Sequence, residues 1–407
     1  MLDAMISSIL LTAGASAIAT SDQPSLMGQM SLKHVAFAEL IDNSLILSTF
    51  DGTPIFGKDA VFAIPSPADL LIPSAQPSPQ KIPGSITWPN TATKAPSSLF
   101  GTEGIVVSGG FLVPGKSNGG LWFAKGEKGE FDEFTQIFGS KGYFYHQTSF
   151  YDVDQDGQLD ILSCRATKPL FGDGHGDLVW LQPVDRSNPI GSWKETVLGK
   201  GCDTFFVVDD VDGDGVTDIL SAEFWGKKLT LIQSPNGKFD DPSGFTYTTI
   251  DDTIGAAFDL SLVDINGDGK RDILATNHDG SGKGGVYAYE IPSKVGAKWI
   301  RHDLSVGFPV LQKGVGQAAP GQAQAFHPNT KSTKGKPTIV VAGDGSQKAY
   351  LLTPNTSTPS DWSFSRSILH DCKCTVGGIA VGDVNGDGKV DVFIPCYDSG
   401  YLATYTF

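Results

Sequence analysis

Apolar and polar positions along the chain form short runs that recur about every 58 residues. The clearest unit is an apolar run, an acidic loop and a second apolar run, as in YDVDQDGQLDIL at residues 151–162. The acidic loop recurs as DVDGDGVTDIL, DINGDGKRDIL and DVNGDGKVDVF, starting at Asp210, Asp264 and Asp383. The last two starts are about two periods apart, so a degenerate copy is expected between them. Self-similarity at such a period indicates a fold built from copies of one unit.

Three further copies keep the apolar runs but have lost the aspartates. They span residues 35–52, 86–110 and 325–345, and the triplet PNT begins at both Pro89 and Pro328. In each full period the acidic loop joins a first strand to a second, and a third and a more polar fourth strand follow. Four short strands per repeat are typical of a β-propeller blade. We therefore predict an all-β fold, a single seven-bladed propeller of four-stranded antiparallel blades over residues 1–407.

The N-terminal segment allows two interpretations. Residues 6–13 are apolar and residues 15–17, ASA, resemble a cleavage site, but Asp3 and the lack of early Lys or Arg are untypical of a signal peptide. Residues 1–25 are thus either a signal peptide or a closing strand. The last predicted blade shows only three strands, and a ring closes best when one blade takes a strand from the other end of the chain. We expect that strand from residues 6–12.

The overall composition fits a turn-rich β protein and narrows the choice of partners. The 407 residues include 49 Gly and 24 Pro, and no apolar run approaches the ~20 residues of a membrane helix. No membrane span is therefore expected. The net charge is −15 without any Lys/Arg cluster, so neither nucleic acid nor an anionic membrane is expected as a partner. The Pro-rich residues 65–84 are predicted to form a surface insertion between the first two blades.

The four acidic loops have the spacing of a calcium site. Positions 1, 3, 5 and 9 carry side-chain oxygens, and position 6 is Gly in every loop. Ca²⁺ accepts six to eight such oxygens at ~2.3–2.6 Å, whereas an EF-hand would need Glu at position 12, which is Ser, Ala or Ile here. We predict about four structural Ca²⁺ ions, in loops between first and second strands, and no organic cofactor. The predicted ligands are Asp152, Asp154, Asp156, Asp160, Asp210, Asp212, Asp214, Asp218, Asp264, Asn266, Asp268, Asp272, Asp383, Asn385, Asp387 and Asp391.

On these motifs the chain resembles the FG-GAP/VCBS repeat family, the calcium-loop propeller blades also found in integrin α-subunits and several fungal lectins. The resemblance covers nearly the whole chain, although three blades lack the aspartates and no metal is expected there. It implies binding of sugars or proteins through loops and inter-blade clefts. The chain also looks like the single-propeller proteins of fungal natural-product pathways that act as intermolecular hetero-Diels–Alderases. Those join a tropolone-derived quinone methide to a sesquiterpene such as humulene.

Function is expected on the face opposite the acidic loops, where first strands begin and second strands end around the central channel. Aromatic side chains with a few polar groups gather at these positions, as a small-molecule pocket requires. The alternative is that the aromatic rings only fill the space between blades. The candidate catalytic residues are Arg165, Glu223, His278 and Asp279. The candidate substrate-binding residues are Trp88, Tyr145, His146, Phe206, Trp225, Phe258, His327 and Tyr397.

Two classes of function fit this face. A cyclase- or lyase-type enzyme would hold an apolar polyene close to its partner, and such proximity can be worth ~7–11 kcal/mol. A His/Asp pair or Arg165 would then assist the loss of water from a hydroxymethyl precursor. The alternative is a secreted or cell-surface carbohydrate-binding or adhesion protein without catalysis. The expected partner is accordingly a small molecule or a glycan, and no sequence-local catalytic motif decides between the two.

Five cysteines are too few for a disulfide scaffold, but they fall near the predicted mouth. Cys164 with Cys202, and Cys374 with Cys396, occupy positions that the propeller would bring together, and Cys372 is left over. Free buried thiols are the alternative. Disulfides and a signal peptide would place the chain in the secretory pathway, which is the predicted localisation, with the cytoplasm as the alternative.

Overall fold

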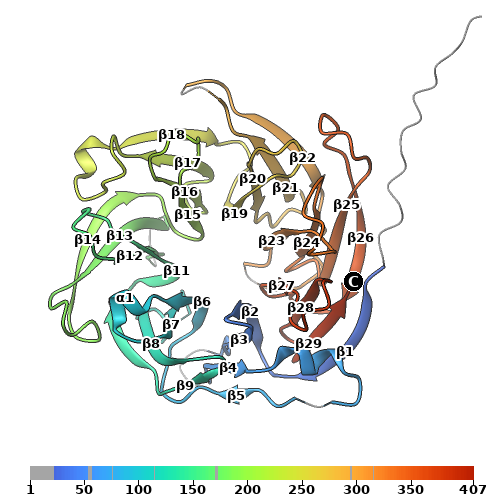
Figure 1. Cartoon of the computed structure of the whole chain (residues 1–407), viewed down its shortest axis with the longest axis horizontal. Coiled ribbons are helices and arrows are strands. Elements are labelled where there is room, and N and C mark those ends of the chain that lie inside the picture. The colour runs from blue at the N-terminus through green and yellow to red at the C-terminus, as the bar shows by residue number, and fades with distance from the viewer. Residues whose placement is uncertain are drawn as a thin grey trace, which may run out of the picture.

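Seven small antiparallel sheets stand in a ring around a central axis in the computed structural model (Figure 1). The structure describes residues 23–53, 57–75, 77–113, 115–169, 173–293, 296–314 and 316–407. Each sheet is one blade, and its first strand lies nearest the axis. The predicted all-β, seven-bladed propeller of four-stranded blades is confirmed.

The first three blades follow directly along the chain. Blade 1 contains β2 (Val35–Ile41), β3 (Ser44–Thr49), β4 (Ala60–Ile64) and β5 (Gln80–Lys81). Blade 2 contains β6 (Pro89–Ala95), β7 (Gly104–Gly109), β8 (Gly120–Glu127) and β10 (Thr135–Gly139), with α1 (Ser97–Phe100) after β6 and β9 (Glu130–Phe131) paired to β8. Blade 3 contains β11 (Phe144–Tyr151), β12 (Asp160–Thr167), β13 (His175–Pro183) and β14 (Trp193–Lys200).

The remaining blades repeat this order. Blade 4 contains β15 (Phe206–Asp209), β16 (Asp218–Glu223), β17 (Lys228–Gln233) and β18 (Thr246–Asp251). Blade 5 contains β19 (Ala257–Val263), β20 (Asp272–Asn277), β21 (Gly285–Glu290) and β22 (Ile300–Val306). Blade 6 contains β23 (Ala323–Phe326), β24 (Thr338–Ala342), β25 (Lys348–Pro354) and β26 (Phe364–Asp371). Blade 7 contains β27 (Ala380–Gly382), β28 (Asp391–Cys396), β29 (Tyr401–Thr406) and β1 (Ser25–Ser31).

The two ends of the chain close the ring within blade 7. Strand β1 pairs antiparallel with β29, from Ser25 opposite Thr406 to Ser31 opposite Tyr401. The expectation of an N-terminal closing strand is confirmed, but its assignment to residues 6–12 is wrong. The closing strand ends only a short link before Val35, where β2 begins, so it connects to the next blade as every other fourth strand does. Residues 1–22, including any signal peptide, lie outside the described residues.

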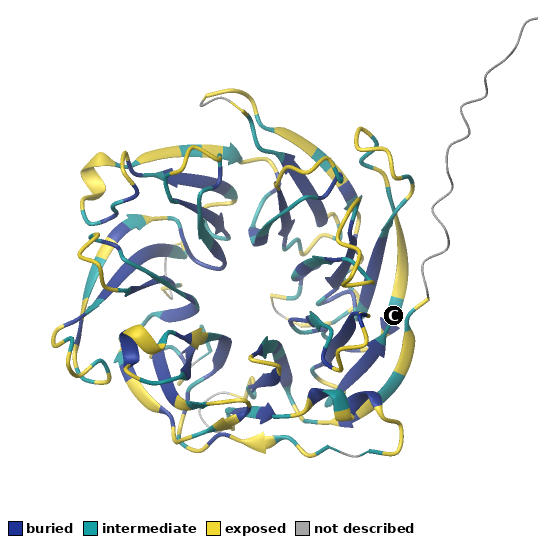
Figure 2. Ribbon diagram, in the orientation of Figure 1, coloured by how far each residue is buried: buried dark blue, intermediate teal, exposed yellow. Residues whose placement is uncertain are grey.

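The core lies between neighbouring blades rather than within any one of them. Every residue of the second strands β3, β7, β16, β20 and β28 is buried, whereas outer strands such as β18 and β22 are largely exposed (Figure 2). Seven clusters of buried apolar side chains in the described part of the chain each join two adjacent blades. Burial of each large apolar side chain stabilises the fold by ~1.5–3 kcal/mol, so the blades stabilise one another.

The Pro-rich residues 65–84 contribute to blade 1. A short 3₁₀ turn, η1 (Pro67–Leu71), buries Leu70 and Leu71 against the core between blades 7 and 1. Strand β5 then pairs with β4 and completes the blade. In the described parts of the chain, no helix has the length and apolar character needed to cross a lipid bilayer.

Candidate functional site

The acidic loops form turns that hold their own carboxylates inward. In blade 4, the Asp210 carboxylate accepts the backbone N–H groups of Gly213 and Gly215 at 2.8 and 2.9 Å. Asp218, at the start of β16, accepts the N–H of Val211 at 3.1 Å. The residue at position 6 of each loop has φ close to +87°, a conformation in which Gly is favoured. The sequence therefore folds each loop into a turn whose oxygens converge.

All sixteen predicted metal ligands lie in the loops between the first and second strands, or at the start of the second strand, of blades 3, 4, 5 and 7. Carboxylate oxygens of Asp152, Asp154 and Asp156 lie within 4.8 Å of one another. Oxygens of Asp210, Asp212 and Asp218 form a second such group in blade 4. The loops of blades 5 and 7 repeat the turn, with Asp264 bonded to Gly267 and Gly269, and Asp383 bonded to Gly386 and Gly388.

The ninth residue of each loop is an unusually buried carboxylate. Neither oxygen of Asp160, nor Oδ1 of Asp391, accepts a hydrogen bond from any described residue. The Arg186 guanidinium, 2.7 Å away, offsets part of the charge of Asp160. Burial raises the pKa of Asp160 and Asp218 to about 6 and that of Asp272 to about 7. Convergent hard oxygens with unpaired lone pairs are the donor set that Ca²⁺ prefers.

The opposite face of the disc, which we call the mouth, carries a polar pair on an aromatic support. His278 directly follows β20, and its Nε2 lies 2.8 Å from Oδ2 of Asp344, which follows β24 in the next blade. The imidazole stacks on the ring of Phe258, with centroids 5.0 Å apart and planes inclined by 23°. Phe224 of blade 4 contacts the same imidazole at 5.9 Å. The two side chains of the pair are 13% and 23% exposed, so a ligand at the mouth can reach them.

A cluster of aromatic rings continues from His278 across the top of the channel. The His146 ring on β11 meets Phe205 edge-to-face at 4.6 Å and Phe258 at 6.4 Å. On its other side it meets Phe37 of blade 1 at 6.0 Å. Rings from blades 1, 3, 4 and 5 therefore form one continuous cluster.

A second aromatic group occupies the mouth at blades 7, 1 and 2. Trp88 is stacked between Phe50 and Phe111, at centroid distances of 4.0 and 5.0 Å. Tyr397 contacts Phe50 at 5.4 Å. Trp88 has φ of +43°, which is unusual for a bulky residue, and its N–H donates to Asp59 at 2.8 Å. The Asp59 carboxylate also forms a buried ion pair with Lys116, and this pair holds the strained Trp88 backbone in place.

Arg165 belongs to a buried ion-pair network inside blade 3. Its guanidinium binds Asp177 at 3.1 Å and also binds Glu195, and it lies 4.0 Å from the centroid of the Tyr143 ring. The Tyr145 hydroxyl donates to the same Glu195 at 2.6 Å. The predicted catalytic guanidinium is therefore already paired with two carboxylates.

Glu223 and Asp279 also bind groups of their own blades. Glu223 accepts the Thr230 hydroxyl at 2.5 Å and lies 3.6 Å from the Lys228 ammonium. Asp279 accepts the N–H groups of Ser281 and Lys283 and holds a turn of blade 5. Both residues lie at the mouth as predicted, but their described bonds stabilise local structure.

The turn that carries Phe224 and Trp225 is fixed by a residue outside the predicted set. The Asp203 carboxylate accepts the N–H groups of Phe224 and Trp225 at 2.6 and 2.9 Å. Burial raises the pKa of Asp203 to about 8, and the nearby Glu223 carboxylate adds to this rise. Asp203 therefore positions two rings of the mouth.

Three predicted substrate-binding residues lie elsewhere. Tyr145 is fully buried between blades 2 and 3, and Phe206 is buried between blades 3 and 4. His327 follows the end of β23, because this strand begins at Ala323 rather than at residue 326. It therefore belongs to the face of the acidic loops, where the Asp264 charge acts on it.

Phe37, Phe205 and Asp344 were not among the predicted site residues. Phe205 takes the place in the channel that was expected for Phe206. Asp344 ends a second strand, so its position at the mouth follows from the repeat, but its pairing with His278 of another blade depends on the tertiary structure. No sequence motif links these residues.

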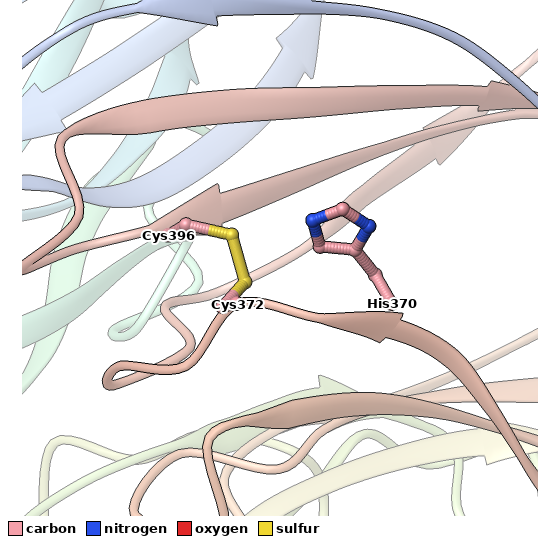
Figure 3. Close-up of side chains that lie close together, drawn as sticks. All are labelled: His370, Cys372 and Cys396. Atoms are coloured by element: carbon pink, nitrogen blue, oxygen red, sulfur yellow. A yellow bond between two sulfur atoms is a disulfide. The ribbon is translucent and has the colours of Figure 1, made fainter.

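Two disulfides tie strands near the mouth. Cys164 pairs with Cys202 as expected, with Cα atoms 5.2 Å apart. The second bond joins Cys372 to Cys396, 5.4 Å apart, beside His370 (Figure 3), and leaves Cys374 as a buried free thiol. The expected pairing of Cys374 with Cys396 is wrong, because a backbone bridge places Val376 opposite Cys396.

Comparisons with known proteins agree with this architecture. The FG-GAP-like repeat family matches residues 210–289, which hold the acidic loops of blades 4 and 5. The N-terminal domain of Nup159 is similar in structure at 12% identity, over 96% of this chain and 97% of that chain, with a TM-score of 0.52. A chain of the S. cerevisiae complex of Dbp5, Nup159 and Gle1 with IP6 and ADP is similar at 11% identity, over 95% and 96%, with a TM-score of 0.50. No curated protein matches the sequence significantly. The repeat match is thus confined to blades 4 and 5, while the seven blades show that the chain as a whole has a propeller fold.

Proposed function

We propose that this propeller is a small-molecule enzyme of the cyclase or lyase type, with its active site at the mouth. The observation that carries the proposal is the His278–Asp344 pair, which joins two blades and rests on the ring of Phe258. A histidine held by a carboxylate is a general acid or base, and an aromatic wall beside it binds apolar ligands. The mouth residues differ from blade to blade, which favours one asymmetric site over repeated pockets.

The reaction that we propose is the one implied by the resemblance to hetero-Diels–Alderases. Protonated His278 donates a proton to the departing hydroxyl of a hydroxymethyl tropolone and the C–O bond breaks, which releases water. The ring hydroxyl passes its proton to solvent water, from which His278 is reprotonated, and the quinone methide remains. Asp344 stabilises the imidazolium before the transfer. The quinone methide then adds to an alkene of a sesquiterpene, forming one C–C and one C–O bond without further proton transfer. The aromatic surface contributes by holding the two reactants close together, and such proximity can lower the activation barrier by ~7–11 kcal/mol.

We further propose that the acidic loops of blades 3, 4, 5 and 7 hold structural Ca²⁺. The carboxylates at positions 1, 3, 5 and 9 would be the ligands, with Asn at position 3 in two loops. The support for this is the convergence of carboxylate oxygens within 4.8 Å in blades 3 and 4, together with the burial of Asp160 and Asp391 at the ninth position. Bound calcium would neutralise the negative charge of these carboxylates. It would do so on the face opposite the mouth.

Turnover by matched variants tests the enzyme proposal. The purified protein is incubated with a hydroxymethyl tropolone precursor and humulene, and the adduct is measured by mass spectrometry. We expect His278→Ala to lower turnover by about 10²–10⁴-fold, the range for loss of a general acid. His302→Ala is the control, because His302 forms the same kind of pair with Glu290 at 2.7 Å but stacks on Trp362 outside the mouth.

The same proteins distinguish the alternative function, a carbohydrate-binding or adhesion protein. Full turnover in His278→Ala, or no adduct from the parent protein, would contradict the enzyme proposal. Binding on a glycan array that survives His278→Ala would instead support a lectin that uses outer loops or inter-blade clefts.

A further inference from the structure

Below the mouth, side chains of the first strands bridge from one blade to the next. The first strand of each blade has a free edge that faces the channel, and several of its N–H groups are bonded by the preceding blade. In these bridges a side-chain oxygen accepts a backbone N–H of the next blade. Glu39 accepts from Ala92, Gln147 from Phe206 at 2.9 Å, and Asp259 from Ala323 at 3.0 Å. The proposed chemistry at His278 does not use these polar groups.

Two polar side chains at this level each have an atom without a hydrogen-bond partner among the described residues. The Nδ1 atom of His146 and the Oε2 atom of Glu39 are buried and have no hydrogen-bond partner among the described residues. His146 is only 6% exposed, so its side chain is more than nine-tenths buried. Buried polar atoms are nearly always paired, and those that are not are completed by water or by a ligand.

Both groups are uncharged near neutral pH. Burial lowers the pKa of His146 to about 4, so the imidazole is neutral. Burial raises the pKa of Glu39 to about 8, although the hydrogen bond from the Ala92 N–H lowers it in part. The carboxyl group is therefore largely protonated at pH 7. A protonated carboxyl donates a hydrogen bond, and a neutral imidazole donates at one nitrogen and accepts at the other. Together they suit an uncharged oxygen rather than an ion.

The position of these groups continues the aromatic surface of the mouth into the channel. Phe37 and Glu39 are two residues apart on β2, so their side chains leave the same face of the strand, about 6.6 Å apart. The Phe37 ring contacts His146, which in turn contacts Phe205 and Phe258. Because β2 runs away from the mouth, Glu39 lies deeper than the His278–Asp344 pair.

We propose that Glu39 and His146 recognise an uncharged oxygen of the substrate, a carbonyl or a hydroxyl, while its apolar part lies on the rings above them. This inference rests on the proposed small-molecule function and adds to it the two residues that bind the oxygen of an uncharged substrate. Glu39, which the sequence did not single out, is then a specificity-determining residue. It selects against ligands that lack the oxygen, because its carboxyl group would remain unpaired.

Two ring compounds of equal size test the proposal. Tropone carries a neutral carbonyl and cycloheptatriene carries none, and the dissociation constants of both are measured by NMR titration of the calcium-loaded full chain. We expect the parent protein to bind tropone at least tenfold more tightly than cycloheptatriene. Glu39→Gln should keep this preference, since an amide also donates and accepts, whereas Glu39→Leu should abolish it without weakening cycloheptatriene. His146→Leu is the second variant, with the same expected loss, in case Glu39→Leu does not fold.

A crystal structure with tropone provides the second measurement, and we expect its oxygen within 3.2 Å of Glu39 or His146. A preference that persists in both leucine variants, or ordered water alone beside the two atoms, would overturn the inference. So would equal affinity for the two compounds in the parent protein. These outcomes leave the enzyme proposal intact if adduct formation still depends on His278. Conversely, an intact preference for tropone without any turnover contradicts only the enzyme proposal.

Discussion

At the scale of single residues, three acids near the mouth and channel are buried deeply enough to favour their protonated forms. Burial raises the pKa of Glu39 and Asp203 to about 8 and that of Asp259 to about 7. A carboxyl group whose folded pKa exceeds its unfolded value stabilises the fold fully below the unfolded pKa. This contribution falls as the pH rises through the folded pKa. For Glu39 the window therefore runs from about 4.5 to about 8.

Replacing Glu39 with its neutral isostere should remove this part of the pH dependence. We expect Glu39→Gln to leave the melting temperature unchanged at pH 4.5 and to raise it at pH 8, by an amount corresponding to roughly 4 kcal/mol of unfolding free energy. Thermal unfolding at saturating calcium is the measurement, and Asp252→Asn, at an exposed position, is the control. Equal melting temperatures of the parent protein and Glu39→Gln at pH 8 would show that the Glu39 carboxyl is not buried as described.

Irregularities in the first strands explain why single residues of the mouth were harder to predict than the mouth itself. The pairing of β11 shifts between Tyr145 and Gln147, so that strict alternation fails at His146. Similar shifts occur near the start of β2, β6 and β19. A bulge re-aims the side chains beside it. The sequence therefore identified the neighbourhood of His146 and Phe258 but could not tell that Tyr145 turns into the core.

At the scale of strands and their links, the cysteine pairing is the most direct test. Digestion without reduction, followed by mass spectrometry, should yield peptides linked through Cys164–Cys202 and Cys372–Cys396. Cys374 is buried, so it should react with iodoacetamide only after unfolding. A linked peptide that contains Cys374 would contradict this pairing.

The repeated strands and loops could be predicted because each copy confirmed the others. Blades 3, 4, 5 and 7 show the same apolar runs around the same loop, and the structure places strands at all of them. The closing strand has no second copy to support it. Its sequence, SLMGQMS, is mostly exposed or half-buried, and it becomes a strand because β29 offers a free edge. Tertiary pairing, which no local pattern encodes, decided this element.

At the scale of the whole molecule, calcium should contribute to stability through four separated blades. Each ion that binds only the folded state contributes about 2.7 kcal/mol when free calcium is 100 times the dissociation constant. We expect EDTA to lower the melting temperature of the parent protein, and Asp268→Ala to reduce the calcium content by one ion. Calorimetry and atomic emission measure the two effects.

The control for calcium is Asp42→Asn, in the short turn between β2 and β3 of blade 1, where no acidic loop exists. It should leave the calcium content unchanged. A melting curve of the parent protein that EDTA does not move would rule out a structural role for calcium. Turnover in Asp268→Ala should remain once the protein is folded, because the loops and the mouth lie on opposite faces.

The pairing of β1 with β29 also fixes when the molecule can finish folding during its synthesis. Strand β1 leaves the ribosome before every other described strand, while its partner is made last, some 370 residues later. Blades 1 to 6 take all their strands from consecutive sequence and can form as they emerge, whereas blade 7 has to wait until β29 has emerged. Until then both β1 and the growing end expose unpaired strand edges, which bind other strands readily. Nascent chains on neighbouring ribosomes therefore have one specific route to misassembly, in which β1 of one copy completes the last blade of another.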